Sequence, residues 1–165
     1  MSSNALKSVG LSLAVVLALC ALARPAAGDT TFIAMIDGAQ NVDPLPVPGT
    51  GSAVMVLNTA ETELSFDIQY QDLIGVETAA HFHNGGPREN GPAKFLLPMG
   101  TPKTGVWNIP PEMVPELYAG RIYINIHTDV YITGELRGNV AQSVPTENTT
   151  WGRVKHLFSV ELPRN

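Results

Sequence analysis

The feature that most constrains this 165-residue chain is a strict two-residue alternation of polar and apolar side chains. It is clearest in residues 63–70, ELSFDIQY, where each of four polar residues is followed by an apolar or aromatic one. It returns in residues 121–127, RIYINIH, where Ile122, Ile124 and Ile126 share one face. Because side chains of a strand point alternately to opposite faces, both segments are predicted to be β-strands with one face in a core.

The rest of the central sequence repeats this pattern in shorter runs. These shorter runs lie at 31–37, 52–57, 94–97, 105–109 and 134–140, and a further strand passes through His81 and His83. With the two segments above, the sequence predicts about eight strands. The links between them are rich in Pro, Gly and Asn, and only residues 111–119 suggest a brief helix. The sequence therefore predicts an all-β sandwich or barrel, and the lack of alternating strands and helices argues against a nucleotide-binding parallel sheet.

The N-terminal segment has the order of a secretory signal peptide. Lys7 supplies a positive start, residues 11–22 form an apolar run too short for a comfortable membrane span, and Ala26-Ala27-Gly28 supplies small residues for cleavage. Residues 1–28 are therefore read as a signal peptide, with an uncleaved anchor as the alternative. We expect the mature protein to be secreted or periplasmic.

The remaining chain divides into a domain at residues 29–142 and a C-terminal extension at residues 143–165. The extension begins as a polar, proline-containing linker that includes a glycosylation triplet at Asn148. It continues as a short amphipathic tail, because Trp151, Val154, Leu157 and Phe158 recur at helical spacing. We expect this tail to dock on the domain or on a partner.

The predicted mature chain is acidic and has no cysteine. Removing the signal removes Cys20, the only cysteine, together with two basic residues and no acidic one. Eight basic and 15 acidic residues then remain, which gives a net charge of about −7. This charge argues against nucleic acid or anionic lipid as a partner, and it is compatible with cationic ligands such as metal ions.

Two histidines share one face of the predicted strand that ends near Asn84. Phe82 is the natural core residue, so His81 and His83 point away from the core, about 7 Å apart along the strand. His127, at the end of the strand 121–127, is the third candidate ligand. Three imidazole nitrogens suit copper or zinc and leave one coordination position open, and the affinity order favours one copper ion over zinc.

Three polar residues near His127 in the predicted sheet are candidates to support such a site. Asn125 and Glu135 are predicted to face outward, where either could bond a ligand histidine and fix its tautomer. Arg137 is expected on an outward face in an ion pair with Glu135 or Asp129, with an anion-guiding role beside a metal as the sharper alternative. The plainer interpretation of Asn125 and Glu135 is a solvated position on a strand, and that of Arg137 is the ion pair.

Several short motifs occur in order between residues 30 and 141. They are HFH at 81–83, NGP at 90–92, AGRIYINIHT at 119–128 and GELRG at 134–138. In these motifs the chain resembles the CHRD domain, a module named from chordin and found in many secreted microbial proteins. The resemblance implies an immunoglobulin-like, Greek-key β-sandwich or barrel similar to that of copper/zinc superoxide dismutase.

The dismutase similarity implies a role for the histidines. Those enzymes place a His-x-His pair on one strand and a further histidine on a late strand around copper, which His81, His83 and His127 match in type and order. The chain departs from the dismutases in the rest of the site. His156 is its one remaining histidine, and the bridging histidine, the zinc ligands and the cysteine pair are missing.

Three function hypotheses follow. The first is an extracytoplasmic protein that binds copper through the three histidines, for sequestration or weak redox chemistry. The second is a structural or protein-interaction module with an extracellular partner, in which His81 and His83 bond to loop backbone near Gly85 and Gly86 and His127 bonds to another strand. The third, a dismutase-like enzyme, is disfavoured by the missing bridging histidine. Hydrolase chemistry has little support, because the chain has no Gly-x-Ser-x-Gly motif and the predicted mature chain has no thiol.

Overall fold

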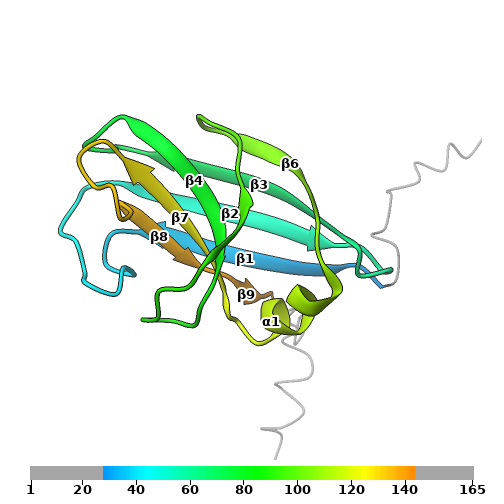
Figure 1. Cartoon of the computed structure of the whole chain (residues 1–165). Helices are drawn as coiled ribbons and strands as arrows, with labels where there is room; N and C mark the ends of the chain where they lie inside the picture. Colours follow the sequence, from blue (N-terminus) through cyan, green and yellow to red (C-terminus); the bar gives the residue numbers. More distant parts are fainter. Residues whose placement is uncertain (1–27, 144–165) are drawn as a thin grey trace, which may run out of the picture.

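The alternating pattern produces nine strands in residues 28–143, the part of the chain that the computed structural model describes (Figure 1). The elements are β1 Thr30–Asp37, β2 Thr50–Leu57, β3 Glu63–Gln71, β4 Glu77–Asn84, β5 Ala93–Leu96, β6 Lys103–Asn108, the 3-10 turn η1 Pro111–Met113, α1 Val114–Tyr118, β7 Ile122–Thr128, β8 Leu136–Asn139 and β9 Ala141–Gln142. The all-β prediction is confirmed, and the brief helix expected near 111–119 is present. The predicted signal peptide up to residue 27, and the predicted tail from residue 144, lie outside the described residues.

All strand pairs are antiparallel, and the strands follow one another in the order β5-β4-β7-β8-β1-β2-β3-β6, with β9 paired to β1. The sheet curls into a nearly closed barrel of eight strands (Figure 1). The connections from β3 to β4 and from β6 to β7 join strands that are not neighbours, as Greek-key folds require. This topology places the histidine strand β4 directly beside β7.

The inner face of the barrel is the apolar half of the alternation. In β3, Leu64, Phe66 and Ile68 are buried, while Ser65 and Asp67 between them are exposed. In β7, Ile122, Ile124 and Ile126 are likewise fully buried. The phase of both strands is therefore the one that the sequence predicts, and it fixes which side chains point away from the core.

An aromatic cluster anchors β4 inside the barrel. Phe82 is fully buried, stacks on Trp107 at a centroid distance of 5.4 Å, and meets the edge of Phe66 at 5.6 Å. Phe95 of β5 packs on Phe66 and Trp107 as well. Because Phe82 is held inward, the flanking residues of β4 must face outward.

The short helix returns the chain to the barrel at β7. Gly120, with φ of 68°, follows α1 in the left-handed conformation that glycine adopts without strain, and β7 begins two residues later. Within residues 28–143, no helix is long and apolar enough to cross a membrane.

Candidate metal centre

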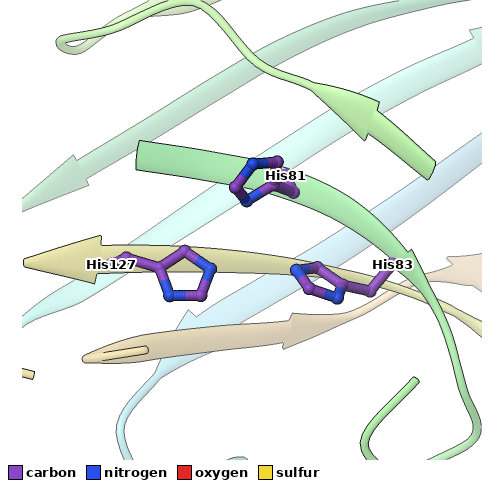
Figure 2. Close-up of side chains that lie close together, drawn as sticks. All are labelled: His81, His83 and His127. Atoms are coloured by element: carbon purple, nitrogen blue, oxygen red, sulfur yellow. The ribbon is translucent and has the colours of Figure 1, made fainter. Parts of the chain in front are cut away.

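The three predicted ligand histidines meet on the outer face of β4 and β7. His81 and His83 come from β4 on either side of Phe82, and His127 comes from β7, where it pairs with Ala79 (Figure 2). Their ring centroids lie 5.3 to 5.9 Å apart. Each residue offers one ring nitrogen, and the three nitrogens all lie within 4.8 Å of one another.

Two of the rings are held by loop carbonyl groups. His83 Nδ1 lies 2.9 Å from the carbonyl oxygen of Gly91, and His127 Nδ1 lies 3.0 Å from that of Ile132. A carbonyl oxygen can only accept, so both Nδ1 atoms carry the proton and both Nε2 atoms keep a lone pair. The second hypothesis expected loop-backbone bonds for His81 and His83: His83 has one, to Gly91 instead of Gly85 or Gly86, whereas none is recorded for His81 among the described residues. For His127 the partner lies in the loop before β8 instead of in another strand.

Three of the four remaining nitrogens of the cluster are buried without partners. Nε2 of His83, Nε2 of His127 and Nδ1 of His81 have almost no exposed surface and form no hydrogen bond within the described part of the chain. A buried polar atom without a partner is unfavourable, so three such atoms on neighbouring rings require an explanation. Three neighbouring imidazole nitrogens, each able to offer a lone pair, are a donor set that a metal ion takes.

The environment of His81 and His83 favours their neutral form. Burial lowers the pKa of His81, and the neighbouring His127 lowers it further. Burial also lowers the pKa of His83, against the raising effect of its bond to Gly91, and His127, His81 and Arg137 add to the lowering. Neutral imidazole is the form that binds a metal, so the folded protein presents these two ligands with less competition from protons.

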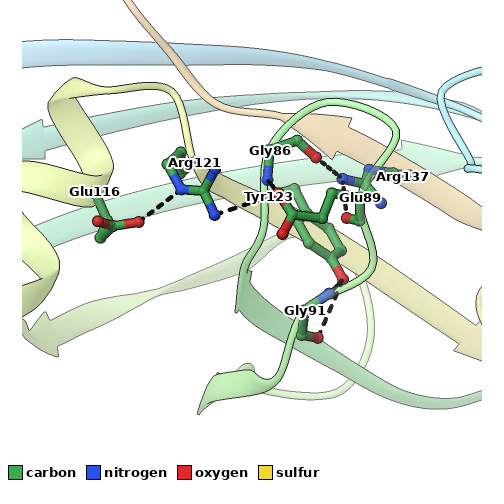
Figure 3. Close-up of polar contacts among 7 residues, drawn as sticks. All are labelled: Gly86, Glu89, Gly91, Glu116, Arg121, Tyr123 and Arg137. Atoms are coloured by element: carbon green, nitrogen blue, oxygen red, sulfur yellow. Dashed lines mark hydrogen bonds and ion pairs between the residues drawn. The ribbon is translucent and has the colours of Figure 1, made fainter.

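The sequence predicts an ion pair of Arg137 with Glu135 or Asp129 on an outward face, but the side chain is buried and pairs with neither carboxylate. Its side chain is 1% exposed and donates to the carbonyl oxygens of Gly86 at 2.8 Å and Glu89 at 3.0 Å (Figure 3). It also donates to the side-chain oxygens of Asn139 and Asn90. Arg137 thereby holds the loop 85–92, whose Gly91 carbonyl orients His83.

Asn125 and Glu135 are buried as well, with exposed fractions of 7% and 0%. Asn125 Nδ2 donates to the carbonyl oxygen of Thr133 at 3.1 Å, next to Ile132, and so fastens the loop that orients His127. Neither residue touches a histidine by a hydrogen bond among those of the described residues. The alternation predicted the face of Asn125 correctly, but loop backbone covers that face in place of water. The carboxylate of Glu135 instead accepts from the hydroxyl of Thr128, which has the strand phase of the buried isoleucines of β7.

Tyr123 lies beside the cluster, and it is not among the site residues that the sequence predicts. It pairs with His83 across β4 and β7, and the two rings stack with centroids 4.9 Å apart and an angle of 16°. The guanidinium carbon of Arg137 lies over the Tyr123 ring as well, 3.5 Å from its centroid. The available signal was the alternation itself, which puts Tyr123 on the face of Asn125 and His127.

This fold and these motifs define a class: an antiparallel β-barrel with a histidine cluster on the outer face of two neighbouring strands. The CHRD domain model matches residues 32–140, which is most of the chain, so the chain belongs to the CHRD domain family. A search of curated proteins and a search of solved structures found no match to it.

Proposed function

We propose that this protein binds one copper ion through His81, His83 and His127, as an extracytoplasmic metal-binding protein. The observation that carries the proposal is the convergence of three buried ring nitrogens that lack hydrogen-bond partners among the described residues. A metal ion on these nitrogens would replace the missing partners. Secretion or export to the periplasm is part of the proposal and is supported by the signal-like residues 1–28.

The donor set fits the ion. Zinc binds imidazole nitrogen at about 2.0–2.1 Å, so nitrogens on one ion lie about 3–4 Å apart, which is inside the 4.8 Å limit of this cluster. The affinity order places copper ahead of zinc for the same nitrogens, and three protein ligands leave a position open. Bound copper would supply a one-electron couple at the protein surface, suited to sequestration or slow redox exchange.

The buried polar residues support this site through the loops. Arg137 fastens the loop that carries Gly91, and Asn125 fastens the loop that carries Ile132. The two carbonyls fix the tautomers of His83 and His127, as partners of metal-bound histidines do in proteins. We assign these residues a positioning role beside the metal.

Calorimetric titration of Cu²⁺ and Zn²⁺ into the metal-free mature chain, predicted as residues 29–165, tests the proposal. We expect stoichiometric copper binding of micromolar or tighter affinity, weaker zinc binding, and loss of both in a His81→Ala/His83→Ala/His127→Ala variant. His156→Ala, which changes the one histidine outside the proposed ligand set, is the matched control and should bind as the parent does. Equal, weak binding by the parent and the triple variant would reject the metal site.

A protein-interaction module is the second candidate, favoured by one observation. Four exposed apolar side chains sit on two loops joined by a backbone bond from Asp129 to Val76: Ile74 is 51% exposed, Val76 72%, Val130 57% and Ile132 78%. Apolar side chains gathered at one surface are typical of a contact with another protein. If metal titration fails, a partner captured by the parent and lost in Val76→Asp would support this function.

A dismutase-like activity is the third candidate. It requires superoxide turnover by the copper-loaded protein that disappears in His81→Ala. The one histidine besides the three proposed ligands is His156, which lies outside the family-matched residues 32–140. That region therefore has no further histidine that could bridge two metal ions.

A further inference from the structure

His83, Tyr123 and Arg137 form a three-layer stack across three neighbouring strands. His83 lies on β4, Tyr123 opposite it on β7, and Arg137 on β8, so the tyrosine ring stands between the histidine and the guanidinium. Figure 3 shows the Tyr123 and Arg137 side chains of this stack. The His83 and Tyr123 centroids are 4.9 Å apart, and the Arg137 guanidinium carbon lies 3.5 Å from the Tyr123 centroid. A fixed cation therefore sits one aromatic ring behind a proposed metal ligand.

The charge of Arg137 is not neutralised by an ion pair. Every hydrogen-bond acceptor recorded for it is a neutral oxygen, of Gly86, Glu89, Asn90 or Asn139. The ion pairs of the described residues do not include it, and the carboxylate of Glu89 in the same loop turns to Arg121 at 3.3 Å instead. Because Arg137 is buried, water screens its field less than it screens a surface charge.

Tyr123 also shares a hydrogen-bond partner with the histidine. Its hydroxyl accepts from Gly91 N–H at 3.1 Å and lies 3.3 Å from the Gly91 carbonyl oxygen, which is the oxygen that His83 Nδ1–H contacts. The tyrosine thus fixes the plane of His83 by stacking and the position of its backbone partner by hydrogen bonding. It also fills the space in which water would otherwise separate His83 from Arg137.

We propose that Arg137, held behind His83 by the Tyr123 ring, biases the proposed copper site toward the cuprous ion. Cu²⁺ carries one more positive charge than Cu⁺, so a fixed buried cation repels the cupric state more strongly. One electron, supplied by an electrode, converts Cu²⁺ to Cu⁺, and the bias is measured as a higher reduction potential. This inference rests on the proposed function, and Tyr123 and Arg137 act in it as positioning residues.

The test measures the affinities of the mature protein for Cu⁺ and Cu²⁺, together with the reduction potential of its copper-loaded form. We expect Arg137→Gln to lower the preference for Cu⁺ over Cu²⁺ at least ten-fold, which is about 59 mV for a one-electron couple. Arg137→Lys keeps the charge and should retain most of the preference. Arg88→Gln removes an exposed cation from the same loop and is the matched control, with an expected change below about two-fold.

A second pair of variants keeps the test valid if Arg137→Gln fails to fold. Tyr123→Leu removes the ring, so water can screen the cation, and it should lower the Cu⁺ preference as Arg137→Gln does. Tyr123→Phe keeps the ring, and it should weaken both oxidation states equally through the lost bonds to Gly91. Copper binding with an unchanged Cu⁺ to Cu²⁺ ratio in Tyr123→Leu overturns this inference alone. Parent copper binding that does not depend on the three histidines overturns the proposed function as well.

Discussion

Glu135 offers a sharp test of how the fold is held together near the histidines. Its carboxylate is fully buried and accepts three hydrogen bonds, from Ile74 N–H at 2.6 Å, Gly75 N–H at 3.2 Å and the Thr128 hydroxyl at 2.8 Å. Thr128 in turn accepts a bond from Tyr131 N–H at 3.0 Å. One carboxylate therefore ties the loop before β4 to the loop after β7.

The substitution Glu135→Ala would leave three donors without their acceptor. Each unsatisfied buried donor is unfavourable by about 1–3 kcal/mol, and water entering beside the half-exposed Ile74 would recover part of the loss. We therefore expect the free energy of unfolding to fall by about 3–5 kcal/mol, a large share of the about 5–15 kcal/mol of a typical domain. Glu135→Gln keeps one acceptor oxygen and should lose about 1–2 kcal/mol.

Urea denaturation of the metal-free parent and variants measures these differences as shifts of the midpoint. Glu112→Gln, at an exposed position in η1, is the control and should change stability by less than about 0.5 kcal/mol. A loss below about 1 kcal/mol for Glu135→Ala would refute the reasoning, because it would mean that the three bonds contribute nothing net. Copper affinity should fall in the same variant, since the loop that orients His127 is loosened.

Three further predictions concern the core and the response to pH. Lys103 is fully buried and paired with Glu77, so Lys103→Met leaves the Glu77 carboxylate without its partner and should lower the free energy of unfolding by about 3–5 kcal/mol. The double variant with Glu77→Gln should recover part of this loss, and urea denaturation measures both changes. Phe82→Ala should lower it by about 3–5 kcal/mol in the same assay, because it empties the centre of the aromatic cluster. Burial lowers the pKa of His81 and His83, so below about pH 6.5 the unfolded chain binds protons that the folded chain excludes. The metal-free protein should therefore melt at a lower temperature as the pH falls from about 7.5 to 5.5, and an unchanged melting temperature would contradict this.

The period-2 alternation was sufficient to predict which residues of each strand face the core. Phe82 and the three isoleucines of β7 are buried as predicted, because a strand has only two faces and the apolar one must leave water. The same argument put His81 and His83 on one face. These predictions depend on neighbouring residues along the chain, and the sequence contains all of that information.

The tertiary structure alone decided what lies over the outer face. Asn125, Glu135 and Arg137 have the polar pattern of outward strand residues, yet each is buried because loops cover them and supply backbone partners, and for Glu135 and Arg137 these loops are more than 50 residues away in sequence. The register of β4 against β7 likewise sets His127 within reach of His81. A polar side chain satisfies its hydrogen bonds equally well with water or with a loop carbonyl, so local sequence does not distinguish the two. Only the packing of distant segments does.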